Sequence, residues 1–256
     1  MAHGTRDGND LYFIWTTLER LGAAEEELRD LAADARSRLF EHVGEPPREL
    51  FATVKTLDGR TDLWTRIDAG TFSMGAEDDT AGRRVKVEQA FELMSVPVTN
   101  AMYAAFAPDH EFPDGKDDHP AVNVNWYEAK SFCHWLGARL PTEKEWEYAC
   151  RAGEAFRNFW SGETDADLGR VGWYQQNAGT SSHPVGEKPA SPFGLYDMHG
   201  NVWAWCEDGL GSEFRVFRGG SFLKSAQAAR SAYRVWYDPS VRLRDLGFRP
   251  ARVITD

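Results

Sequence analysis

Residues 193–203 read Phe-Gly-Leu-Tyr-Asp-Met-His-Gly-Asn-Val-Trp, and this stretch is one of seven short segments that decide the fold. From Gly70 onward the chain consists of short strand-like pieces with many Gly and Trp residues, instead of long helical periods. One such segment would carry little weight, whereas seven in order are highly specific. The other six are Gly70–Gly75, Pro97–Asn100, His119–Ala129, Ala138–Tyr148, Arg218–Phe222 and Gly247–Arg249.

Two helices are expected within these segments, because each has a reciprocal capping pair at its start. The first begins at Asn125 with Glu128 three residues later, and the second begins at Thr142 with Glu145 in the matching position. Each ends at the next glycine along the chain. The second helix also carries Glu143 and Glu147, and capping and solvation explain this acidic cluster without a catalytic role.

The seven segments together resemble the sulfatase-modifying-factor or formylglycine-generating-enzyme domain family, over roughly Leu63 to Val253. The resemblance implies an α+β, C-type-lectin-like fold with two helices, a small twisted antiparallel sheet and little other regular secondary structure. We expect this domain to occupy residues 61–256. We expect residues 1–60 to form an N-terminal helical extension, with the start of a hairpin at its end. A fold does not determine a function, so the site residues are considered separately.

The chemistry of the family's enzymes depends on residues that this sequence lacks. The resemblance implies that formylglycine-generating enzymes hold copper with two cysteines shortly after the Arg-Gly-Gly-Ser segment, and thiolates suit Cu(I). Here no cysteine follows that segment, and Lys224 stands about where the first would fall. Related sulfoxide synthases bind iron through three histidines, but His3 and His42 are too far apart for that motif. We therefore predict a protein that is not an enzyme and requires no cofactor.

Three other features of the sequence have structural interpretations. Cys133, Cys150 and Cys206 are an odd number at low density and are read as small core residues, without a disulfide framework. His119 and His199 lie in fold motifs and are read as hydrogen-bonded structural residues. Neither a nucleophile elbow nor a phosphate-binding glycine loop is present.

A weak calcium site is expected in the loop that contains Gly-Asn-Val-Trp. The resemblance implies ligands at Asp197, Gly200 and Val202, with a further carboxylate two residues later. That last position is Ala204, which offers no side-chain oxygen, whereas calcium takes six to eight oxygen ligands. The alternative is a loop that closes without metal.

The final forty residues alternate framework positions with bulky or charged ones, and this segment resembles the ligand-binding segment of variable proteins diversified by retroelements. Trp236 and Tyr237, followed by Asp238-Pro239, indicate an exposed turn with aromatic residues at its rim. Buried packing is the alternative for each aromatic residue. The predicted ligand-binding residues are Phe222, Lys224, Tyr233, Val235, Trp236, Tyr237, Val241, Leu243, Arg244 and Asp245.

The charge distribution supports a basic and aromatic recognition surface. The whole chain has 256 residues and a formal net charge of -11, which disfavours binding to nucleic acids or anionic membranes. Between Arg215 and Arg252, however, nine basic residues are opposed only by Asp238 and Asp245. These arginines either tie loops together or meet an acidic or polar ligand.

The sequence therefore predicts a non-enzymatic ligand-binding protein with its recognition surface near the C-terminus, and the resemblance of that segment implies a retroelement-diversified variable protein. The alternatives are a metal-dependent oxidase or related enzyme of the same fold, and an adaptor in a larger assembly. The amphipathic helices expected before residue 45 serve either as a packing extension or for docking to a partner or a second copy. The sequence begins without a signal peptide and has no run of transmembrane length, so a cytoplasmic location is expected.

Overall fold

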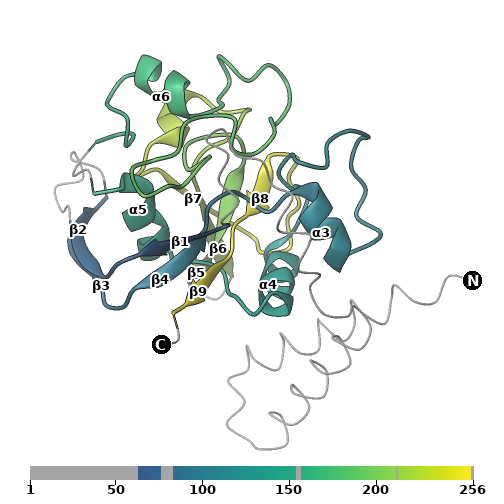
Figure 1. Cartoon of the computed structure of the whole chain (residues 1–256), viewed down its shortest axis with the longest axis horizontal. Helices are drawn as coiled ribbons and strands as arrows, with labels where there is room; N and C mark the ends of the chain where they lie inside the picture. The colour runs from purple at the N-terminus through teal and green to yellow at the C-terminus, as the bar shows by residue number, and fades with distance from the viewer. Residues whose placement is uncertain (1–62, 76–82, 154–156, 212, 255–256) are drawn as a thin grey trace, which may run out of the picture.

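Three small sheets organise the described part of the chain, which a computed structural model gives as residues 63–75, 83–153, 157–211 and 213–254. The expected helices and hairpin strand before residue 60 lie outside the described residues. The antiparallel sheet β1-β4-β9 brings the first and last described strands together (Figure 1). Its strands are β1 (Trp64–Ile67), β4 (Phe91–Met94) and β9 (Ala251–Val253).

The four-stranded sheet has the order β7-β6-β5-β8 and carries the C-terminal segment. The β5–β6 and β6–β7 pairs are antiparallel, whereas β5 and β8 are parallel. A separate hairpin joins β2 (Gly70–Met74) to β3 (Arg83–Val87). The strands of the larger sheet are β5 (Trp203–Leu210), β6 (Phe214–Arg218), β7 (Arg234–Tyr237) and β8 (Leu246–Phe248).

The two predicted helices are present with the predicted caps. α4 (Trp126–Trp135) and α5 (Glu143–Arg151) each begin with a complete capping box, at Asn125 and Thr142 respectively. Two further helices, α3 (Asn100–Phe106) and α6 (Asp165–Val171), were not predicted, although α6 also has a capping box, formed by Thr164 and Asp167. A short 3-10 helix, η2 (Ala226–Ala229), completes these elements. The arrangement confirms an α+β fold with short, scattered elements.

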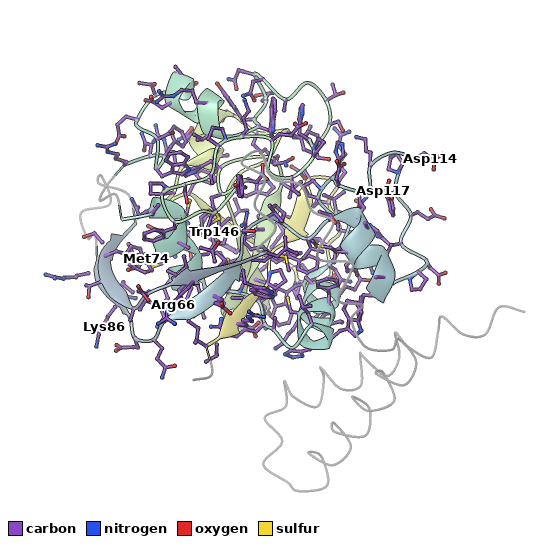
Figure 2. The ribbon with its side chains drawn as sticks, viewed as in Figure 1. Arg66, Met74, Lys86, Asp114, Asp117 and Trp146 are labelled. Atoms are coloured by element: carbon purple, nitrogen blue, oxygen red, sulfur yellow. The ribbon has the colours of Figure 1, made fainter. Side chains whose placement is uncertain are left out.

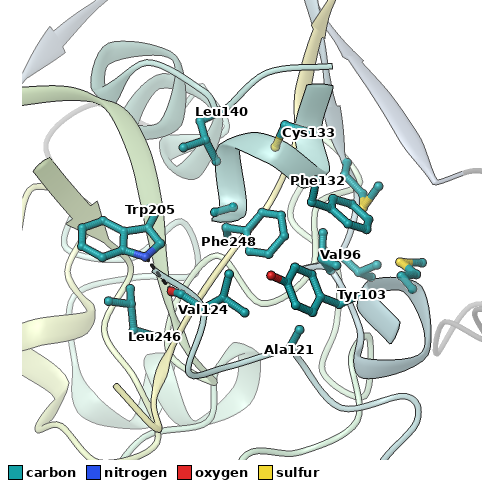
Figure 3. Packing of buried hydrophobic residues seen from close by; sticks show 14 of the residues in the cluster. Val96, Tyr103, Ala121, Val124, Phe132, Cys133, Leu140, Trp205, Leu246 and Phe248 are labelled. Carbon is teal, nitrogen blue, oxygen red and sulfur yellow. Dashed lines mark hydrogen bonds between the residues drawn. The ribbon is translucent and has the colours of Figure 1, made fainter. Parts of the chain in front are cut away.

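The main core packs α4 against the central strands of the larger sheet. Phe132 of α4 and Phe248 of β8 meet edge to face with ring centroids 5.4 Å apart, and Tyr103 of α3 joins them (Figure 3). Trp205 of β5 is fully buried, and its indole N–H donates to the carbonyl of Val124 at 3.0 Å. A second core lies around Trp146 of α5. Both cores leave β7 at the edge of the protein.

Candidate functional site

An exposed aromatic surface surrounds strand β7. Five large hydrophobic residues among those described are exposed, and four of them lie on or beside the β6–β7 pair. Trp236 and Tyr237 are 43% and 52% exposed, Tyr233 is 39% exposed, and Phe214 at the start of β6 is 38% exposed. Such concentration marks a recognition site more often than scattered single residues do. We refer to Phe214, Tyr233, Arg234, Trp236 and Tyr237 as the β7 surface.

The strand pairing divides these side chains between the two faces of the sheet. Trp236 lies opposite Val216, and Arg234 lies two residues away on the same face, with its guanidinium carbon 5.7 Å from the Trp236 ring centroid. Tyr237 lies opposite Arg215 on the other face. Arg215 in turn stacks on the ring of Trp126 at 4.6 Å. The β7 surface therefore presents Trp236 with Arg234 on one face of the sheet and Tyr237 on the other.

A buried ionic network fixes the start of β7. Arg218 is fully buried, and its Nη1 donates to the carbonyls of Ala232 and Tyr233, both at 2.8 Å. The same guanidinium pairs with Glu147 of α5, which also pairs with Arg151 at 2.7 Å. The guanidinium carbon of Arg218 also lies 5.3 Å from the ring of Trp146, and both side chains are buried. Figure 2 shows Trp146 near the centre of the view, whereas Lys86 and Asp114 lie at its periphery. Charge-assisted bonds of this kind hold the backbone before β7 in one position.

This network corrects the interpretation of the acidic cluster on α5. Glu143, Glu145 and Glu147 are all buried, so solvation does not explain them. Glu145 does form the predicted cap, and it also accepts two hydrogen bonds from Arg139, both at 2.7 Å. The sequence pattern showed the local cap but not the arginines that reach these carboxylates from distant segments.

Main-chain hydrogen bonds also hold the loop that follows β7 in place. The amide of Trp126 donates to the carbonyl of Pro239, and the amide of Asn123 donates to that of Leu243, both at 3.0 Å. Arg242 forms a bidentate ion pair with Glu128 of α4. The loop is thus attached to α4 and to the segment preceding it, which supports a preorganised surface.

The predicted ligand-binding residues occupy different environments. Val235 to Tyr237 form a strand rather than the predicted turn, and the turn follows at Asp238. The side chain of Phe222 is buried against Ala178 and Val202. Asp245 is also buried, and it accepts a 2.6 Å hydrogen bond from the Ser221 hydroxyl. The ligand-binding role predicted for these two residues stays a prediction.

The remaining predicted residues fall into two groups. Val235, Val241 and Leu243 are half-buried and pack against the main core. Lys224 and Arg244 are exposed. The carbonyl of Lys224 accepts a hydrogen bond from the amide of Gln175 at 3.0 Å, which anchors its backbone. The ligand-binding role of all these residues stays a prediction.

The loop expected to bind calcium is closed by hydrogen bonds. Asp197 is buried, and its two carboxylate oxygens accept from the amide of Gly186 at 2.9 Å and from the side chain of Asn201 at 3.3 Å. Burial raises the pKa of Asp197, although these hydrogen bonds oppose the shift. Gly200 and Val202 are buried in the same loop. Within the described residues no group of three His, Cys, Asp or Glu side chains is placed to hold a metal. Calcium binding in this loop stays a prediction.

The three cysteines are buried and unpaired, as predicted. Burial raises the pKa of the Cys150 thiol to about 12. Its neighbour His199 is also buried, which lowers the pKa of that imidazole to about 4. His199 Nδ1 lies 2.8 Å from the carbonyl of Ala229, and its Nε2 accepts from the amide of Trp160 at 3.2 Å. These bonds confirm a structural role for His199.

Comparison with known proteins gives the family. The model for the sulfatase-modifying factor enzyme 1-like domain matches residues 50–254, and the chain belongs to this family. In the described part of the chain, no helix is both long enough and apolar enough to cross a membrane.

Relatives of the chain include proteins named as enzymes and one named as inactive. The formylglycine-generating enzyme of Streptomyces coelicolor is 33% identical over 168 residues, covering 54% of each chain. The inactive C-alpha-formylglycine-generating enzyme 2 of Bos taurus is 35% identical over 182 residues, covering 62% of this chain and 58% of the relative. The serine/threonine-protein kinase pkn1 of Chlamydia caviae is 35% identical over 157 residues, covering 54% of this chain but 25% of the relative. The chain spans between a quarter and about three-fifths of these relatives.

A solved structure supports the resemblance to variable proteins. Treponema denticola variable protein 1 superposes with a TM-score of 0.68 and 26% identity, covering 75% of this chain and 95% of that protein. The C-type-lectin-like fold of the family is thereby confirmed, and the chain's relatives include both enzymes and a variable protein.

Proposed function

We propose that this chain is a non-enzymatic ligand-binding protein that uses the β7 surface to recognise another protein. The single observation that carries the proposal is the gathering of four exposed aromatic side chains around one edge strand. Aromatic and arginine side chains dominate the binding energy of protein interfaces. The similarity to a variable protein is consistent with this use of the fold.

The position of the cysteines also supports binding over catalysis. No cysteine follows the Arg-Gly-Gly-Ser segment, and Cys133, Cys150 and Cys206 lie in other segments, where they are fully buried. Burial raises the pKa of all three thiols, which disfavours the thiolate that coordinates copper. The β7 surface requires no metal or cofactor to make contacts.

The test uses peptides selected from a displayed library of random linear sequences against the full chain. The double variant Trp236→Ala/Tyr237→Ala should bind these peptides at least about 30-fold more weakly, because such anchors contribute about 2 kcal/mol or more. Val253→Ala is the matched control, since Val253 is equally exposed but lies on β9. Unchanged urea midpoints will show that the variants are folded.

Two results would contradict the proposal. One is a double variant that binds the selected peptides as tightly as the unchanged chain does. The other is copper or iron retained at about one ion per chain, together with oxidation of a cysteine-containing peptide.

A further inference from the structure

The two edges of the four-stranded sheet differ sharply. At one edge, all three residues of β8 are buried, and the carbonyl of Phe248 accepts a hydrogen bond from the amide of Val98 at 3.1 Å. At the other edge, three of the four residues of β7 are exposed. Edge strands pair readily with other chains unless they are covered. Among the residues that the structure describes, others cover β8 and none covers the outer edge of β7.

The outer backbone of β7 is available for pairing. β7 pairs with β6 on one side, and no described residue hydrogen-bonds to the main chain of residues 234–237 on the other. In an antiparallel pair, alternate residues direct both N–H and C=O away from the partner strand. Two residues of β7 therefore direct donors and acceptors outward, and no residue in the described ranges pairs with them.

Neither a bulge nor a proline interrupts β7. Its register with β6 runs without a bulge from Arg218↔Arg234 to Arg215↔Tyr237. Pro239 lies after the strand and does not interrupt it. Arg218 fixes the backbone immediately before the strand through the carbonyls of Ala232 and Tyr233. An added strand would therefore meet a template that is already ordered.

The charges around β7 favour an acidic partner. Arg151, Arg218 and Arg234 contact two carboxylates, those of Glu143 and Glu147. Glu143 is shared by Arg218 at 3.8 Å and by Arg234 at 3.5 Å, and the side chain of Arg234 is 54% exposed. Arg234 therefore shares its carboxylate partner with a buried arginine, and its exposed guanidinium can contact a further acidic group.

We propose that an extended peptide segment of a partner protein adds to β7 as a fifth strand of this sheet. Its alternate side chains place an acidic group beside Arg234 and, two residues away, an apolar group beside Trp236. The partner segment is short, because four residues of strand span about 13 Å. This inference rests on the proposed function of the β7 surface and specifies the chemistry of its ligand.

Backbone methylation of the bound peptide tests the strand pairing. Peptides are selected on the full chain, and their affinities for the chain and for Trp236→Ala/Tyr237→Ala are measured by calorimetry. We expect an acidic residue two positions from an apolar one in the selected sequences. N-methylation of the peptide amides that face β7, which are those of every second residue, should weaken binding about fivefold or more per lost hydrogen bond. N-methylation of the intervening amides, which face away from β7, should leave the affinity unchanged. The second set of peptides is the matched control.

A charge exchange tests the contact with Arg234. Arg234→Glu should weaken binding of the acidic peptides about tenfold, and replacing the peptide's acidic residue with Lys should restore it. Arg66→Glu, an exposed arginine on β1, should have no effect.

Different outcomes would overturn different claims. Some peptides could fail to bind the double variant and yet tolerate N-methylation at every position. That result would overturn the strand pairing but not the proposal that ligands bind the β7 surface. Peptides that bind the double variant normally would overturn the proposed function itself. Pairing of β7 with a second copy would overturn the peptide-partner proposal, and it would appear in sedimentation as a dimer that Trp236→Ala dissociates.

Discussion

Removing the carboxylate of Glu147 should strongly destabilise the protein. The side chains of Glu147, Arg151 and Arg218 are 1%, 4% and 0% exposed, so Glu147→Ala leaves two buried guanidinium groups without their shared partner. Breaking a buried pair in this way costs about 3–5 kcal/mol. In this variant Arg218 keeps two carbonyl acceptors, and Arg151 keeps the carbonyl of Gly75. The free energy of unfolding should therefore fall by an amount near the lower end of that range, about 3 kcal/mol.

Urea unfolding followed by tryptophan fluorescence measures this loss. With an m-value of about 2 kcal/mol/M, the midpoint should fall by roughly 1.5 M. Glu147→Gln should have a smaller effect, since it retains an acceptor for the amide of Gly75. Asp68→Ala breaks the exposed pair with Arg66 and should cost below about 1 kcal/mol. A loss for Glu147→Ala as small as that for Asp68→Ala would refute the role assigned to the network.

Three further predictions concern positions outside the β7 surface. Gly220→Ala should cost about 1–3 kcal/mol by urea unfolding, because φ is +76° and the new Cβ would lie 2.7 Å from Ala229 Cα; Gly137→Ala, with no atom within 4 Å, should cost less. Burial lowers the pKa of His199 to about 4, so the unfolded chain binds a proton at this residue more readily than the folded chain does. The free energy of unfolding should therefore fall by about 3 kcal/mol as the pH falls from about 6.5 to about 4. A free energy of unfolding that stays constant in that window would contradict this assignment. Millimolar calcium should leave the melting temperature unchanged, because both carboxylate oxygens of Asp197 already accept hydrogen bonds. A rise of several degrees that EGTA reverses would instead show that the loop binds calcium.

Local sequence signals predicted the elements whose cause is local. The capping boxes at Asn125 and Thr142 use residues three apart, and both helices begin where those boxes place them. The capping box of α6 uses Thr164 and Asp167 in the same way, so the same reasoning could have found that helix. α3 begins at Thr99 with no acidic residue in its first turn, which left little signal.

The features of the candidate site that the sequence did not show have a common physical cause. Burial of Phe222 depends on Ala178 and Val202, and burial of Asp245 depends on Ser221, none of which is its immediate neighbour in sequence. Likewise, the partner Arg218 lies 71 residues from Glu147. Alternation of bulky and framework residues identified the segment that carries the β7 surface. It could not show which of those side chains point inward, because that depends on the packing of distant segments.

Hydrogen exchange of the full chain, with and without a selected peptide, tests most directly whether β7 is where ligands bind. We predict slowed exchange at backbone amides of Arg234–Tyr237, with little change around Lys224 and in the loop of Asp197. Protection around Lys224 or Asp197, with β7 exchanging as in the free protein, would contradict the account.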